Sequence, residues 1–237
     1  MYRWLRRIAL GSGLMLTGAA VAVFFLYRAA TAPVPEYQAL VEQTRQQLET
    51  GEIEQNRQEL ESQLAALYSD AAEATRWETT ITELQLNSWL ATQLVHDFPE
   101  LAEQGVYDPR VLIKAGVVTL AMRAELHGMN AVVAFDLEPF VAEDGSLALE
   151  LAAARVGSAP LPTAQIMDQL NAAMGDEGLP GRWSTSNGNP VLLIDFEQQA
   201  SSFNFSRSLD AIEVRQGEVY IAGETLERAP RVAEVSR

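Results

Sequence analysis

The sequence predicts an α+β fold, in which a curved antiparallel β-sheet packs with two or three helices. In the first half of the chain apolar residues recur every three or four positions, which is the period of an amphipathic helix. From Arg110 onward apolar and polar residues alternate, which is the period of a strand with one buried face. Glycine-containing turns separate the alternating segments, so we expect consecutive strands to pair.

The composition excludes several classes of function. The chain has no cysteine, which rules out disulfides, thiolate catalysis and cysteine-ligated metal sites. After Arg28 there are 13 basic against 32 acidic side chains, and a surface of that charge repels nucleic acid at long range. We therefore expect no nucleic-acid partner.

The N-terminal residues predict a membrane anchor. Ile8 to Tyr27 contain no charged residue, and a helix of that length spans about 30 Å, the thickness of the bilayer's hydrocarbon core. Three arginines precede the segment and one follows it, which favours a cytoplasmic N-terminus. Residues 1–32 are thus predicted to be a cytoplasmic tip and a single-pass signal-anchor. The remainder would be extracytoplasmic, and periplasmic in a Gram-negative cell.

A cleaved signal peptide is the alternative interpretation of the same segment. Ala30, Thr31 and Ala32 fit the small-residue rule for a cleavage site, but the apolar run is longer than a usual signal-peptide core and Pro33 would follow the cut.

Residues 33–76 are predicted to form a helical stalk. Apolar residues at Leu60, Leu64, Leu67 and Ala71 give one narrow stripe, and Gly51 is expected to interrupt the helix. The helix over residues 36–74 would be either a dimerising coiled coil or a helical pair packed on its own domain.

Residues 77–230 are predicted to be the extracytoplasmic domain. Thr82 followed by Gln85 forms a capping-box pattern that opens a helix ending near Pro99. Alternating residues then predict a meander of strands, with Asp144 and Gly145 at one of its turns.

The rest of this domain is predicted to contain one helix and three further strands. The helix is expected over residues 163–174 and a loop over residues 178–190. Strands follow at 191–196, 211–215 and 218–225, and residues 231–237 are expected to be a flexible tail. Residues 111–120 and 212–221 share one pattern of a hairpin with a central glycine, which either is an internal repeat or reflects what any tight hairpin requires.

Three short motifs carry a family resemblance: Glu83 to Ala91 (ELQLNSWLA), Asp108 to Val111 (DPRV), and Val156 to Pro162 (VGSAPLP). Together with the anchor they resemble uncharacterised membrane-anchored bacterial proteins of planctomycete and verrucomicrobial type. More remotely they are similar to the YpmS-like family of anchored bacterial proteins. The resemblance covers residues 80–225 and implies an architecture, but no reaction, catalytic residue or cofactor. Gln85 stands where an acidic residue is expected.

No catalytic motif is apparent in the sequence. His96 and His127 lack the spacing of a metal site, and neither a GxSxG elbow nor a Gly-rich phosphate loop is present. The carboxylate pairs Asp136/Glu138 and Asp195/Glu197 lie at strand positions that a solvated face would fill. We therefore expect no cofactor and no enzymatic activity.

The apolar face of the predicted sheet is the feature of the sequence that suggests a function. Either helices cover it as an ordinary core, or part of it stays open as a groove. The candidate groove residues are Leu120, Met122, Leu126, Val133, Phe135 and Leu149.

The leading hypothesis is a non-enzymatic envelope protein, attached to the lipid bilayer by its anchor, that binds a lipid-like ligand or an envelope protein partner. A scaffold acting through the stalk helix is the alternative, and an envelope hydrolase is the third.

Overall fold

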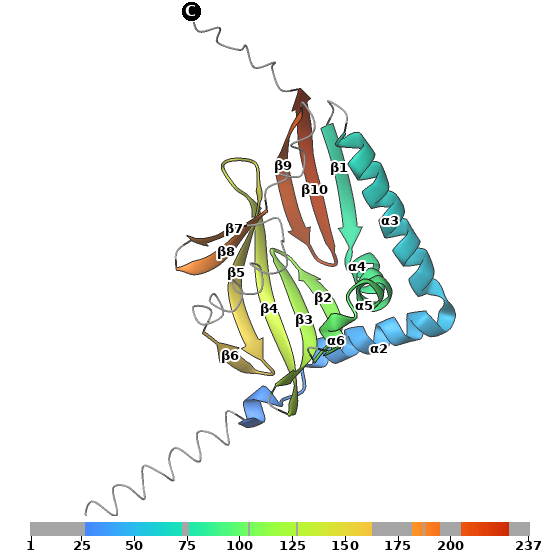
Figure 1. Cartoon of the computed structure of the whole chain (residues 1–237), viewed down its shortest axis with the longest axis vertical. Helices are drawn as coiled ribbons and strands as arrows, with labels where there is room; N and C mark the ends of the chain where they lie inside the picture. Colours follow the sequence, from blue (N-terminus) through green and yellow to red (C-terminus); the bar gives the residue numbers. More distant parts are fainter. Residues whose placement is uncertain are drawn as a thin grey trace, which may run out of the picture.

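The computed structural model describes residues 27–72, 76–103, 105–126, 128–162, 182–186, 188–194 and 205–227. They form two antiparallel sheets with helices along one side (Figure 1), so the predicted α+β class is confirmed. No helix of the described residues is both long and apolar enough to cross a membrane. Apart from Tyr27, the predicted anchor lies outside the described residues, as do the predicted helix 163–174 and the tail 231–237.

Two helices make up most of the predicted stalk. Helix α2 spans Pro35–Thr50 and helix α3 spans Glu52–Asp70, with the expected break at Gly51. Both bury one face against the rest of the chain, through Tyr37 and Leu40 in α2 and through Ile53 and Leu60 in α3. The segment is therefore a bent pair of helices packed on its own domain (Figure 1).

A strand that the sequence analysis missed follows α3. Strand β1 spans Arg76–Thr82 and leads directly into helix α4, Glu83–Trp89. The predicted capping box is confirmed: the Gln85 N–H donates to Thr82 Oγ1 at 3.2 Å, and the Thr82 N–H donates to Gln85 Oε1 at 3.0 Å. The helix continues as a π-helical turn, η1 (Leu90–Leu94), then α5 (Val95–Asp97), and the short α6 (Glu100–Glu103) follows.

The larger sheet has the strand order β2-β3-β4-β5-β8-β7, with the short β6 beside β5. The predicted meander is confirmed in β2 to β5. Strand β7 was predicted as loop, but it forms a hairpin with β8. The strands are β2 (Val106–Lys114), β3 (Val117–Leu126), β4 (Met129–Val141), β5 (Leu147–Val156), β6 (Ala159–Leu161), β7 (Arg182–Ser186) and β8 (Asn189–Ile194).

The smaller sheet has the order β1-β10-β9 and corrects the prediction of a single sheet. Strands β9 (Phe205–Arg215) and β10 (Glu218–Glu227) form a hairpin, and β1 pairs with β10 across 136 or more residues of chain. Because β1 was not foreseen, the hairpin had no partner in the prediction except the larger sheet.

The turns of two hairpins join the sheets. The Gly116 N–H in the β2–β3 turn donates to the Val214 carbonyl at 3.0 Å, and the Gly217 N–H in the β9–β10 turn donates to the Ile113 carbonyl at 3.0 Å. In the repeated pattern Gly116 corresponds to Gly217, and Ile113 to Val214. The two hairpins are thus equivalent in their contacts as well as in their sequence pattern.

Helix α4 completes this joint. Its Leu86, with Leu90 one turn later, packs against a buried cluster of Val111, Ile113 and Val219 from both hairpins. The backbone groups at the outer edge of β2 would be unpaired without further partners. Side chains form hydrogen bonds with them.

Two residues of the ELQLNSWLA motif close that edge. The Asn87 side chain donates to the Val111 carbonyl at 2.7 Å and accepts from the Val111 N–H at 2.8 Å. The Glu83 carboxylate accepts from the Ile113 N–H at 2.6 Å. The motif therefore has a structural role: Gln85 caps the helix, Leu86 enters the core, and Glu83 and Asn87 replace a neighbouring strand.

Candidate functional site

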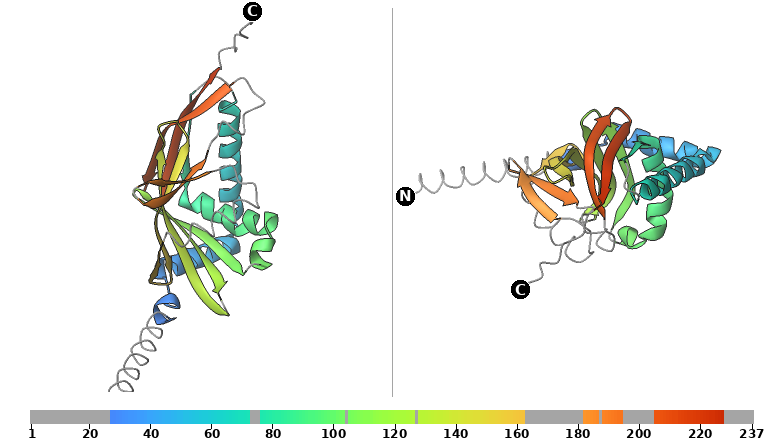
Figure 2. Two further views of the ribbon diagram at one scale, coloured as in Figure 1. Left: turned by 60° about the vertical axis from the view of Figure 1, so that its left-hand side comes forward. Right: turned by 90° about the horizontal axis from the view of Figure 1, so that it is seen from above.

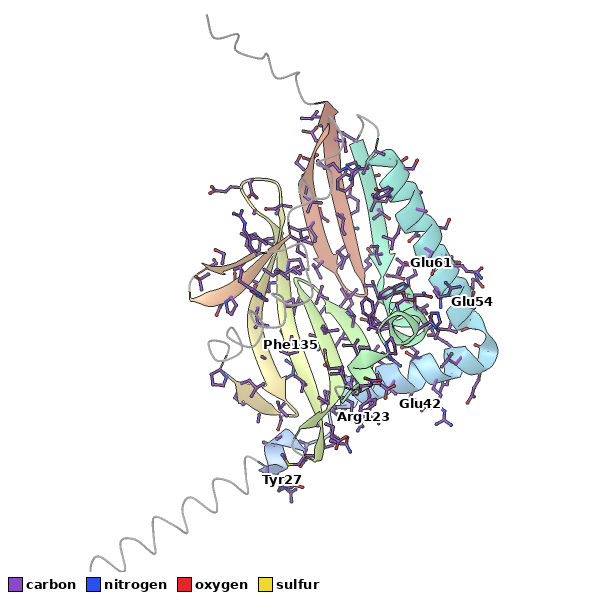
Figure 3. The ribbon with its side chains drawn as sticks, viewed as in Figure 1. Tyr27, Glu42, Glu54, Glu61, Arg123 and Phe135 are labelled. Carbon is purple, nitrogen blue, oxygen red and sulfur yellow. The ribbon has the colours of Figure 1, made fainter. Side chains whose placement is uncertain are left out.

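An apolar cavity lies between the C-terminal half of α3 and the smaller sheet. Its volume is about 320 Å³. Figure 2 shows α3 beside this sheet, and Figure 3 shows the side chains between them. The residues that line it come from α3, β1, β9 and β10: Leu64, Leu67, Tyr68, Ala71, Trp77, Arg207, Ser208, Leu209 and Ile221.

The floor of the cavity depends on one glycine. Gly223 in β10 pairs with Trp77 in β1, and a Cβ atom at Gly223 would lie 2.4 Å from the indole ring. The ring can therefore approach β10 this closely only because position 223 has no side chain. The indole N–H donates to Thr225 Oγ1 at 3.2 Å, which satisfies the polar atom of an otherwise apolar wall.

Polar contacts fasten the end of α3 to the sheet. The carbonyl of Ala71 accepts from Arg207 Nε at 2.7 Å and from Thr225 Oγ1 at 3.1 Å. The guanidinium carbon of Arg207 lies 5.6 Å from the centre of the Tyr68 ring, within the range of a cation–π contact. Among the described lining residues, Arg207 carries the one formal charge.

The helix side of the cavity is partly open to solvent. Leu64 is 41 % exposed and Tyr68 is 67 % exposed, whereas Leu60, one turn earlier on the same stripe, is 2 % exposed. The apolar stripe of α3 is thus core packing at Leu60 and partly uncovered at Leu64, one turn later.

The sequence-predicted groove lies on the larger sheet instead. Leu120 pairs with Phe135, and Met122 pairs with Val133, so these four side chains share one half-buried face. Leu120 packs into the joint cluster. Leu149 in β5 pairs with Pro139, and Leu126 pairs with Met129 at the end of β3. Of the six predicted groove residues, none lines the cavity beside α3.

Two other cavities are smaller or more polar. One of about 250 Å³ between α2 and α4 is lined by Gln43, Thr44 and Gln47 among others, and Gln47 Oε1 is buried without a hydrogen-bond partner in the described part of the chain. Another of about 160 Å³ lies beside Phe98 and Tyr107. Neither combines an apolar wall with the volume of the cavity beside α3.

The titratable residues form structural contacts. Asp136 accepts from Thr119 Oγ1 at 2.7 Å and pairs with Arg155, and His96 is exposed. Burial raises the pKa of Tyr37 in α2 and lowers the pKa of Arg110 in β2, and the two side chains interact with each other. No group of three or more metal-ligating side chains occurs within the described ranges. His127 and the Asp195/Glu197 pair lie outside them.

Part of the site was visible in the sequence. The stripe through Leu64, Leu67 and Ala71 was noted, but its partner surface was missed because strand β1 was not predicted. No sequence signal connected Arg207 with the end of α3, since 136 residues separate Arg207 from Ala71.

Comparisons with models of known protein families, with curated proteins and with solved structures find no match to this chain. The resemblance to anchored bacterial proteins therefore stays a prediction.

Proposed function

We propose that this chain is a single-pass membrane-anchored envelope protein that holds the acyl chain of an anionic amphiphile in the cavity beside α3. The observation that carries the proposal is the cavity itself, which has a volume of about 320 Å³ and a mostly apolar lining. That volume falls within the range of roughly 300–1,000 Å³ that is usual for small-molecule sites. The role is binding rather than catalysis.

The charge distribution supports an anionic headgroup. The chain has a net charge of −15, so most of its surface repels an anion. Arg207 places a cation among the apolar lining residues. An amphiphile with its chain against Leu67 and Ile221 and its headgroup at Arg207 would match both the apolar and the charged parts of the site.

A photoreactive fatty acid, with the reactive group on its acyl chain, tests this site in the full chain held in phosphatidylcholine nanodiscs. We expect crosslinked peptides from the end of α3 and from β9 or β10. Leu64→Glu should abolish this labelling, because it places a charge at the apolar mouth. Leu48→Glu is the matched control, since Leu48 is 53 % exposed on α2 and does not line the cavity.

Two results would contradict the proposed site. One is labelling confined to the anchor; the other is equal labelling of the two glutamate variants. The methyl ester of the same fatty acid should label the site less, because it lacks the charge that Arg207 would pair with.

The proposed anchoring has a separate test. Since the chain has no cysteine, a single cysteine at Ala66, which is exposed on α3, reports the side of the membrane. A membrane-impermeant maleimide should label it from outside the cytoplasmic membrane of cells with a permeabilised outer envelope. Labelling that requires lysis of that membrane would reverse the proposed orientation.

A further inference from the structure

The segment directly after the predicted anchor is fixed to the folded domain. Its carbonyl at Ala29 accepts from the Ser158 N–H at 2.9 Å and from Ser158 Oγ at 3.2 Å. Within the segment the Thr31 N–H donates to the Tyr27 carbonyl at 3.0 Å, which makes it a helical turn. The residues directly after the predicted membrane boundary are therefore joined to the β5–β6 turn.

The β5–β6 turn is shaped to receive this segment. A Cβ atom at Gly157 would lie 2.3 Å from the Ala29 carbonyl oxygen and 2.5 Å from that of Ala30, distances that no side chain permits. The Gly157 N–H donates to the Val132 carbonyl at 2.7 Å, so the turn is itself held by β4. The contact is thus a close backbone-to-backbone approach that depends on glycine.

The contacts continue from this turn into α2. Val34 and Tyr37 pack against Ala121 and Ala134 of the larger sheet. The Tyr37 hydroxyl donates to the Asp108 carbonyl at 2.8 Å. Pro33 and Pro35 further restrict the connecting backbone. Between Tyr27 and Tyr37, therefore, the segment contacts the domain at Ala29, Val34 and Tyr37, and it lacks the Gly/Ser-rich composition of a flexible linker.

The docked segment and the cavity lie at opposite ends of the molecule. Figure 1 is drawn with the longest axis vertical; the segment after residue 27 lies at the bottom, and the far end of α3 lies at the top beside β1 and β10. Figure 3 shows the same separation, with Tyr27 at the bottom and the middle of α3, marked by Glu61, well above it.

We infer that residues 27–37 are a rigid bracket, which fixes the domain on its anchor with the cavity beside α3 directed away from the anchor's membrane. The inference rests on the proposed function. Its consequence is that an amphiphile in the cavity has left the anchor's own bilayer, because residues 27–37 dock at the end of the domain opposite the cavity.

Energy transfer to the membrane tests the bracket. In nanodiscs that contain acceptor-labelled lipid, a donor is placed on a single cysteine at Glu125, two residues from Arg123 in the lower part of the molecule in Figure 3, or at Ala66, between the cavity residues Leu64 and Leu67; both positions are exposed. We expect strong transfer from position 125 and weak transfer from position 66. Equal transfer from the two positions in the otherwise unchanged chain would overturn the inference.

A pair of glycine substitutions sharpens the test. Gly157→Val should reduce the difference between the two labels, because the added side chain displaces the docked segment. Gly188→Val is the matched control: it also has a positive φ, of +88°, but an added Cβ there meets no atom within 4 Å. A Gly157→Val chain that behaves like the control would contradict the bracket, and if it does not fold, the comparison of the two labels in the unchanged chain still decides.

The result of the energy-transfer experiment does not depend on whether the chain binds a fatty acid. No ligand is added, so a failure of fatty-acid binding leaves the energy transfer unchanged. A chain without an anchor would not remain with the nanodisc during purification.

Discussion

The joint between the sheets and the cavity beside α3 use neighbouring positions of the same strand in different ways. At the joint, Val219 of β10 is buried and the adjacent edge of β2 is fully paired through Asn87 and Glu83. At the cavity, Ile221 of β10 faces a space of about 320 Å³ bounded by the exposed Leu64. One region is filled and hydrogen-bonded, and the other is left open.

The joint therefore serves stability, whereas the cavity is the region proposed to bind a ligand. The joint holds the motif that gave the family resemblance, yet each of its polar groups is used to complete the fold. The cavity carries no recognisable motif, but it retains uncovered apolar surface, which a stable domain would be expected to fill unless something binds there. The proposed binding function therefore lies at the less distinctive of the two regions.

We expect the largest difference in unfolding free energy between two substitutions in α3. Leu60→Ala should cost between about 2 and 5 kcal/mol of unfolding free energy, because it opens a void in packed core. Leu64→Ala should cost less than about 1 kcal/mol, because that side chain is already partly in water. Urea unfolding of the full chain in a mild detergent, followed by circular dichroism, measures both. A cost at Leu64 equal to that at Leu60 would show that the cavity is ordinary core.

The next largest difference in unfolding free energy is expected at the edge of β2. Asn87→Ala removes both hydrogen bonds to Val111 and leaves a buried N–H and carbonyl unpaired, at a cost of about 1–3 kcal/mol for each group. Asn130→Ala is the control, since Asn130 is exposed on β4, and its cost should stay within about 0.5 kcal/mol. The same urea unfolding measures both, and a small effect at Asn87 would mean that water can replace its side chain.

Smaller and equal losses of stability are expected from substitutions at the two hairpin turns. Gly116→Ala and Gly217→Ala each force a side chain into a positive φ, of +82° and +79°, which costs roughly 1–2 kcal/mol. Because the turns are equivalent in their contacts, the two losses of stability should agree. Unequal losses in thermal unfolding would show that the repeated pattern does not give the hairpins equivalent roles.

Much of the fold could be predicted from local pattern. The break at Gly51, the capping box at Thr82 and the strands that follow Arg110 depend on period and turn chemistry, which a single segment of sequence displays. Strand β1 could not be predicted in this way. Its sequence, RWETTIT, is short, lies between two helices and pairs only with β10, at the other end of the chain.

The candidate site was less predictable than the fold for the same reason. Half of its wall, the stripe on α3, is local and was seen. The other half requires Trp77, Arg207 and Ile221 to converge from three strands, and the position of the Trp77 ring requires that Gly223 carry no side chain. The predicted groove on β3, β4 and β5 was inferred from the alternation within these strands, without knowledge of the α4 packing that places Leu120 in the joint.

The most direct measurement uses Trp77, whose ring lines the cavity. In a full chain with Trp4, Trp89 and Trp183 replaced by phenylalanine, Trp77 is the remaining tryptophan, and a brominated fatty acid quenches its fluorescence only on contact. The proposed function predicts saturable quenching that Leu64→Glu abolishes and Leu48→Glu preserves. Absence of saturable quenching in a folded chain would contradict it.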